Sequence, residues 1–305
     1  MKKLLLIGLQ SLFFCSFLLK SMEENHFKVG LFSYTQQGNN QTACYDIKRY
    51  LGNNIGVGLF DGHKGALVAK LLKSDFFDSV AFWLEEKNDI KESLYKGLIC
   101  CEHDSRDIQC GDPMESQASR LVASWMNVTS GQGSLLSLGD SFTCLIGGKA
   151  VSMLSPQKKV DVLNTPFLVV GDKTLKNQSE HIYSLELEYY SYPIEDKYDY
   201  LVLATHGFYD VLAHEDEEKQ YLDFKKIFFD VLHLSKEEFD LLYPSPHDII
   251  KAEESSDDAQ GMQNRFGLED VALNNEMSVL AEKLVQVALS RGSDKNITVI
   301  VQFLK

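Results

Sequence analysis

Six short runs rich in β-branched and aromatic residues constrain the fold of this chain more than any other feature. Such runs predict β-strands, and they lie at residues 26–32, 55–60, 141–146, 167–170, 200–205 and 297–303. Apolar residues recur at three- and four-residue spacing over residues 65–87, 90–103 and 277–293, which predicts amphipathic helices. Because helices separate only some of the strands, regular βαβ alternation is absent. We therefore expect an α+β fold with antiparallel sheets.

The length of 305 residues and the hydrophobic content of 44% suit one compact domain, which we place at residues 22–305. A formal net charge of −14 argues against nucleic acid and anionic membranes as partners. The six cysteines are too sparse for a disulfide scaffold. Cys100, Cys101, His103 and Cys110 fit no common zinc-ligand spacing, so a helix with small apolar side chains is the preferred interpretation over a zinc site.

The first 21 residues form an apolar segment of ambiguous role. Two lysines precede the apolar run from Leu4 to Leu19, as in the first regions of a secretory signal. The run is short for a membrane span, and no small-x-small cleavage site follows it. We expect a segment without targeting function, such as a helix packed on the domain, and a cytoplasmic protein. The alternative is a signal or anchor, which would make the protein secreted or membrane-attached.

Two stretches are acidic and polar with little periodicity, at residues 213–222 and 251–277. Such composition is typical of solvated loops. We therefore expect an acidic insertion at about residues 213–277.

Three stretches combine an apolar strand with polar residues at one of its ends. The strand at 55–60 leads into Asp61, Gly62 and His63, and a carboxylate followed by glycine suits a divalent cation but is also a common turn. The strand at 200–205 leads into His206 and a glycine, with Asp210 four residues beyond. Near the C-terminus the sequence SRGSDKN joins a helix to the last strand.

In this order and spacing, the three stretches resemble the metal-dependent Ser/Thr phosphatases of the protein phosphatase 2C family. Members typically read FDGHGG, then ACDGxWDV, then SRGSxDNxTV. The resemblance covers about residues 27–305 and is weak between 104 and 195. It implies a sandwich of two packed antiparallel β-sheets flanked by α-helices. It also implies two Mg²⁺ or Mn²⁺ ions, held by carboxylates, that activate a water for attack on phosphoserine or phosphothreonine.

The resemblance assigns roles to residues near the first motif. Asp61 matches a bridging metal ligand, Gly62 a carbonyl ligand, and His63 a histidine proposed to protonate the leaving group. In the preceding segment, Asp46 matches a remaining carboxylate, whereas Tyr45 stands in place of a glutamate. Gln41 takes the place of the phosphate-binding arginine.

The later motifs have lost anionic ligands. His206 replaces a metal-binding aspartate, and Lys295 replaces another, with Asp294 displaced one position upstream. An ammonium in place of a carboxylate repels a dication at a cost on the order of several kcal/mol at an effective dielectric near 20. The sequence GDSF at 139–142 resembles either the family's GDSR strand pair, with Phe142 for the arginine, or its earlier Gly-Ser-Thr strand. Asp140, Asp210 and Asp294 are therefore uncertain ligands.

From these substitutions we expect a pseudophosphatase that acts as a regulatory module by binding a protein partner. The expected cofactor is none, or one weakly held Mg²⁺ or Mn²⁺. We hypothesise that Lys295 pairs with Asp61 or Asp46 in place of the missing cation. The alternative is a divergent Ser/Thr phosphatase that uses one metal ion, or a pair that includes His206.

Overall fold

The computed structural model describes fourteen segments of the chain, with gaps between them. These are residues 28–34, 43–50, 54–63, 65–87, 89–108, 117–127, 129–139, 141–148, 150–154, 170–171, 187–194, 197–212, 217–244 and 275–304. At residues 43–50, 63, 106, 153, 217, 218, 221 and 275 the description is limited to the backbone.

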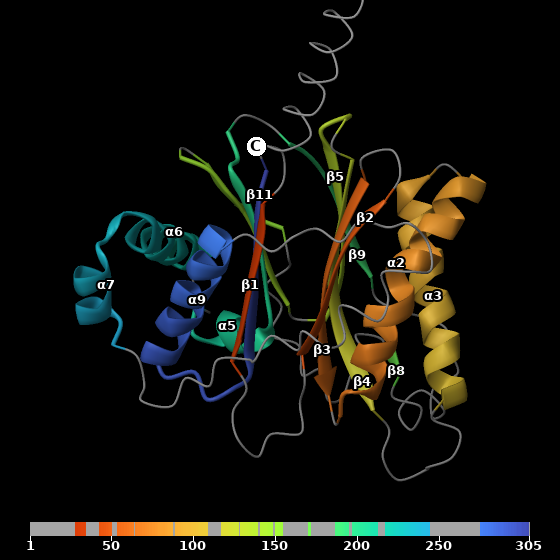
Figure 1. Ribbon diagram of the computed structural model, residues 1–305, viewed down its shortest axis with the longest axis horizontal. Helices are drawn as coiled ribbons and strands as arrows, with labels where there is room; N and C mark the ends of the chain where they lie inside the picture. Colours follow the sequence, from red (N-terminus) through yellow and green to blue (C-terminus); the bar gives the residue numbers. More distant parts are fainter. Residues whose placement is uncertain are drawn as a thin grey trace, which may run out of the picture.

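The described strands form two antiparallel sheets (Figure 1). The first has the order β1-β11-β10-β6-β7, and the second the order β2-β3-β4-β5-β9, with β8 paired to β4. The first sheet contains β1 (Val29–Tyr34), β6 (Phe142–Ile146), β7 (Val151–Met153), β10 (Tyr200–Ala204) and β11 (Ile297–Phe303). The second contains β2 (Ala43–Tyr50), β3 (Asn54–His63), β4 (Ala118–Asn127), β5 (Gln132–Leu138), β8 (Val170–Gly171) and β9 (Glu188–Pro193).

Helices cover the outer face of each sheet, so the molecule has four layers (Figure 1). One outer layer consists of α2 (Leu67–Lys87) and α3 (Ile90–Ile108) beside the second sheet. The other consists of α5 (His206–Asp210), α6 (Glu217–His233), α7 (Lys236–Leu242) and α9 (Asn275–Ser290) beside the first sheet. This arrangement confirms the expected fold of two packed antiparallel sheets flanked by helices.

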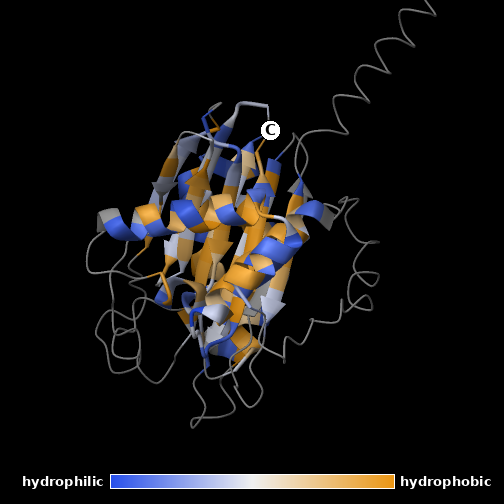
Figure 2. Cartoon of the chain, turned by 90° about the vertical axis from the view of Figure 1, so that its left-hand side faces the viewer, coloured by the Kyte–Doolittle hydropathy of each residue, from blue (hydrophilic) through white to orange (hydrophobic). Residues whose placement is uncertain are grey.

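Apolar side chains fill all three interfaces between the layers. Strand alternation sends Phe60 toward the helices and its neighbour Leu59 toward the other sheet. Phe76 and Phe77 of α2 are fully buried against the second sheet, and burial of one such side chain contributes about 1.5–3 kcal/mol. Figure 2 shows apolar strand residues beneath helices whose turns alternate between polar and apolar. This apolar packing sets the position of the two sheets relative to each other.

The predicted strands and helices are present where the structure describes them, with shifted ends. The loop prediction was wrong for residues 217–222, because α6 begins at Glu217. Phe224, Ile227, Phe228 and Val231 repeat at helical spacing and are buried, so the acidic residues before them occupy the first turns of the same helix. Most of the 251–277 stretch lies outside the described residues, as does the apolar segment at residues 1–21.

Across the described segments, no helix is both long enough and apolar enough to cross a lipid bilayer.

Candidate functional site

Asp61 marks the end of the apolar run of β3. Val57 and Leu59 point into the interface between the sheets, and Asp61 follows them on the same strand face because side chains alternate with a period of two. Its side chain is only 10% exposed. Gly62 is buried and pairs with Ser119 of β4. The strand geometry therefore places the Asp61 carboxylate at the end of the interface between the two sheets.

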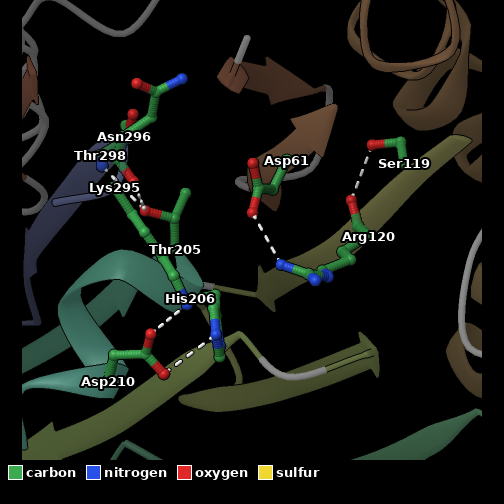
Figure 3. A network of polar contacts seen from close by, with 9 residues as sticks. All are labelled: Asp61, Ser119, Arg120, Thr205, His206, Asp210, Lys295, Asn296 and Thr298. Carbon is green, nitrogen blue, oxygen red and sulfur yellow. Dashed lines mark hydrogen bonds and ion pairs between the residues drawn. The ribbon is translucent and has the colours of Figure 1, made fainter. Parts of the chain in front are cut away.

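Arg120 of β4 stands directly opposite Asp61 in the β3–β4 pair. Its Nη1 donates a hydrogen bond to Asp61 Oδ2 at 3.3 Å, and its side chain is 13% exposed (Figure 3). Directly opposed residues have Cβ atoms about 4.5–5.5 Å apart, so the register itself brings the two charges together. The carboxylate thus has a guanidinium as a neighbour at the position where the resemblance implies a metal ion.

Arg120 was not among the site residues predicted from the sequence. The only signal was a single arginine within the small and apolar run ASRLVASWMN, in the part of the chain where the resemblance is weak. An arginine on the inner face of a strand requires a partner, but the identity of that partner depends on the register with β3.

We expect the Arg120–Asp61 pair to stabilise the fold measurably. Arg120→Ala should lower the free energy of unfolding by about 2 kcal/mol, because it removes a charge-assisted hydrogen bond from a nearly buried carboxylate. In a double-mutant cycle with Asp61→Asn, measured by urea unfolding, we expect a coupling of about 1–2 kcal/mol. The exposed Lys28–Glu276 pair is the control, with a coupling near zero. Additive effects of the Arg120 and Asp61 changes would contradict the expectation.

Thr205 connects the end of β10 to β11. Its backbone N–H donates to Thr298 O, and its Oγ1 accepts from Thr298 N, each at 3.0 Å. The same hydroxyl donates to Asn296 O at 3.3 Å, and it makes no capping hydrogen bond to α5. The threonine therefore holds the segment before β11 against the start of α5.

The short helix α5 brings His206 and Asp210 together. They are four residues apart and lie on one helix face, with His206 Nε2 and Asp210 Oδ1 separated by 2.9 Å. β3 ends and α5 begins at the same end of the sandwich, the lower end in Figure 1. The second and first motifs thus meet at one edge, as the resemblance implies.

The turn between α9 and β11 places Lys295 beside this helix. Lys295 Nζ donates to Asp210 Oδ2 (Figure 3), and Ser293 Oγ donates to Gly207 O at 2.8 Å. A Cβ on Gly207 would lie 2.5 Å from Asn296 O. Only glycine therefore permits this close approach of the second and third motifs.

The predicted pairing of Lys295 with Asp61 was wrong. The Lys295 ammonium contacts Asp210, because α5 and the α9–β11 turn are joined by direct hydrogen bonds. The other predicted partner, Asp46, has its side chain outside what is described. Asp294 is exposed to solvent and Lys295 is half-buried. The upstream aspartate therefore does not take the position of Lys295.

Several predicted site residues have a described backbone only, or none. Tyr45 pairs with Leu59, Asp46 with Gly58, and His63 with Ala118. The side chains of these three residues lie outside what is described, and so do residues Gln41 and Asp140. Phe142 is buried at the start of β6, where the chain crosses from β5 in one sheet to the other sheet.

The carboxylates of Asp61 and Asp210 each face basic groups. Asp61 faces Arg120 on the second sheet, and Asp210 faces His206 and Lys295 on the side of the first sheet (Figure 3). Among the side chains that are described, no group of three or more His, Cys, Asp or Glu residues is placed to hold a metal ion. Among the described residues, the candidate metal ligands predicted from the sequence are the carboxylates of Asp61, Asp210 and Asp294, the imidazole of His206 and the carbonyl of Gly62.

Similarity to known proteins agrees with this architecture. No family model matches the chain. The chain is 26% identical over 182 residues to "Probable protein phosphatase 2C 56" of Oryza sativa subsp. japonica, a match covering 52% of this chain and 50% of that protein. The chain therefore spans about half the length of the curated relative it matches.

Solved structures show the same fold at low identity. A serine-threonine phosphatase 2C from Toxoplasma gondii superimposes with a TM-score of 0.59 at 14% identity, covering 92% of this chain and 96% of that one. A sex determining protein of C. elegans gives a TM-score of 0.60 at 14% identity, with 92% of this chain and 65% of that chain covered. The shared fold, the curated relative and the order of the three motifs together identify the chain as a protein phosphatase 2C-like protein.

Proposed function

We propose that this phosphatase-like domain is a pseudophosphatase, a catalytically inactive regulatory module that acts by binding a protein partner. The observation that carries the proposal is the pairing of two site carboxylates with basic side chains, Asp61 with Arg120 and Asp210 with Lys295. The compartment in which it acts is proposed to be the cytoplasm, on the sequence argument alone.

The charges at this edge do not fit the metal centre that the family resemblance implies. Two closely spaced dications require several anionic ligands, because their mutual repulsion at 4 Å exceeds what one carboxylate offsets. Here an arginine and a lysine add two positive charges, and they compensate Asp61 and Asp210 one for one. A dication bound at either carboxylate would have to displace its basic partner and would then lie close to that cation. We therefore derive no catalytic step through metal ions for this chain.

A phosphatase assay tests the proposal directly. The protein is incubated with a phosphoserine peptide in millimolar Mn²⁺, beside the Asp61→Ala variant. We expect phosphate release by the two proteins to be equal and at the level of the buffer blank. Turnover that depends on Asp61 would instead favour the alternative, a divergent Ser/Thr phosphatase with a reduced metal site.

A further inference from the structure

A shallow pocket lies on the solvent side of the α2–α3 layer. Its lining residues come almost entirely from one face of α2: Asp75, Asp78, Ser79, Phe82 and Trp83, together with Cys100 of α3. The spacing of the α2 residues follows the helical repeat, so they form one stripe. The layer covers the face of the second sheet that points away from the first sheet (Figure 1). Asp61 faces the opposite direction, so the pocket is separate from the edge described above.

Two aromatic rings form the apolar part of the pocket. Phe82 is 57% exposed, and its ring centroid lies 5.4 Å from that of Trp83 in an edge-to-face arrangement. Neither ring belongs to the cluster that α2 buries against the sheet. Lys96 Nζ lies 4.5 Å from the centroid of Trp83, so this indole already attracts a cation. Two adjacent aromatic side chains are therefore kept at the surface without a role in the described core.

The segment of α2 that carries the two rings is acidic, and Lys96 beside Trp83 comes from α3. Residues 75–86 contain Asp75, Asp78, Glu85 and Glu86 and no lysine or arginine. On α3, burial and, after it, the charge of Asp75 raise the pKa of Cys101. Carboxylates beside exposed aromatic rings complement a cation on an apolar stem, which describes both arginine and lysine.

We propose that this pocket binds an arginine- or lysine-bearing segment of a partner protein. The cationic head groups pair with Asp75 and Asp78, and the apolar stems pack on Phe82 and Trp83. Aromatic side chains with a charge partner are the usual anchors of protein interfaces. The inference deepens the proposed function, since it gives the module a binding surface. Its tests measure binding at Cys100 and not hydrolysis, so either proposal can fail alone.

Cys100 provides a reporter within the pocket. It is a free, partly exposed thiol, whereas the neighbouring Cys101 is buried. We would measure the modification rate of Cys100 by peptide mass spectrometry with two thiol reagents of equal size, the cationic trimethylammonium-ethyl and the anionic sulfonato-ethyl methanethiosulfonate. The modification rate for each reagent is divided by the rate at which the same reagent reacts with the small thiol β-mercaptoethanol, which corrects for intrinsic reactivity. A field of clustered carboxylates should favour the cationic reagent by about tenfold at low salt.

The pocket carboxylates should account for this preference. We expect the ratio to fall to near one in Asp75→Asn/Asp78→Asn and to persist in Glu237→Gln/Glu282→Gln. The second variant removes the same charge from the opposite helical layer. A ratio unchanged by the pocket variant, or lowered equally by both variants, would overturn the proposal.

Protection by a peptide tests binding itself. An acetylated, amidated peptide of alternating arginine and leucine should slow the modification of Cys100 by neutral N-ethylmaleimide. The same peptide with citrulline in place of arginine should not slow the modification. In the Phe82→Ala variant, protection by the arginine peptide should be about tenfold weaker, as expected for loss of an interface anchor. Equal protection by both peptides, or none at millimolar concentration, would overturn the proposal.

Discussion

Replacing the basic residues of the candidate site with neutral or acidic ones is expected to create a divalent-cation site. In the variant Arg120→Ala/His206→Asp/Lys295→Asp, the Asp61 and Asp210 carboxylates lose their described basic partners and gain two acidic neighbours. A unit charge at 4 Å is worth about 4 kcal/mol at an effective dielectric of 20, and 1.4 kcal/mol corresponds to about tenfold in affinity. Repulsion among the carboxylates offsets part of this gain. We expect Mn²⁺ to bind about 100-fold more tightly than to the parent.

Two measurements check this expectation. Isothermal titration calorimetry gives the Mn²⁺ affinity, and thermal unfolding with and without Mn²⁺ shows whether the ion stabilises the fold. In EDTA the variant should melt below the parent, because the carboxylates repel one another without a cation.

A matched control separates a site from a general charge effect. Lys226→Ala/His233→Asp/Lys236→Asp makes the same charge change at exposed positions of α6 and α7. We expect the control to bind Mn²⁺ no better than the parent. If the site variant gained no more affinity than this control, the charges at the edge would not be what opposes metal binding.

Gly30→Ala is expected to be among the most destabilising single substitutions in the described part of the chain. A Cβ at this position would lie 1.9 Å from the backbone carbonyl carbon of Met277 and 2.1 Å from the backbone nitrogen of Ser278. Backbone atoms cannot rotate away as a flexible side chain can, so β1 and α9 would have to separate. We expect a loss of about 3 kcal/mol or more in the free energy of unfolding, measured by urea denaturation.

Gly148→Ala is the matched control for this substitution. A Cβ there meets no atom within 4 Å, and we expect a change within about 0.5 kcal/mol. Similar losses at both positions would show that glycine's backbone freedom, and not the β1–α9 contact, sets the cost. The contact concerns the candidate site as well, because α9 leads directly into the turn that carries Lys295.

The pattern of the sequence predicted the fold class and most of the regular elements near the motifs. The run ITVIVQF is strand β11 with the predicted ends, and α2 and α3 follow the apolar spacing of residues 65–103. Strands β2, β4, β5, β7 and β9 were not predicted. β4 and β5 carry serines among their apolar residues, and β9 is largely tyrosine. Such strands lack the continuous β-branched run that makes a strand evident in a single sequence.

The sequence also showed that His206 and Lys295 stand at the positions where the family resemblance implies metal-binding aspartates. It did not determine which charges meet. Lys295 reaches Asp210 because Thr205 and Ser293 tie the third motif to the second. Arg120 reaches Asp61 because the β3–β4 register places them opposite each other. The partners of the Arg120–Asp61 pair are 59 positions apart in the sequence, and those of the Lys295–Asp210 pair are 85 positions apart. The packing of strands and turns brings these partners together. The local sequence pattern does not specify this packing, so only the tertiary structure decided which charged residues form pairs.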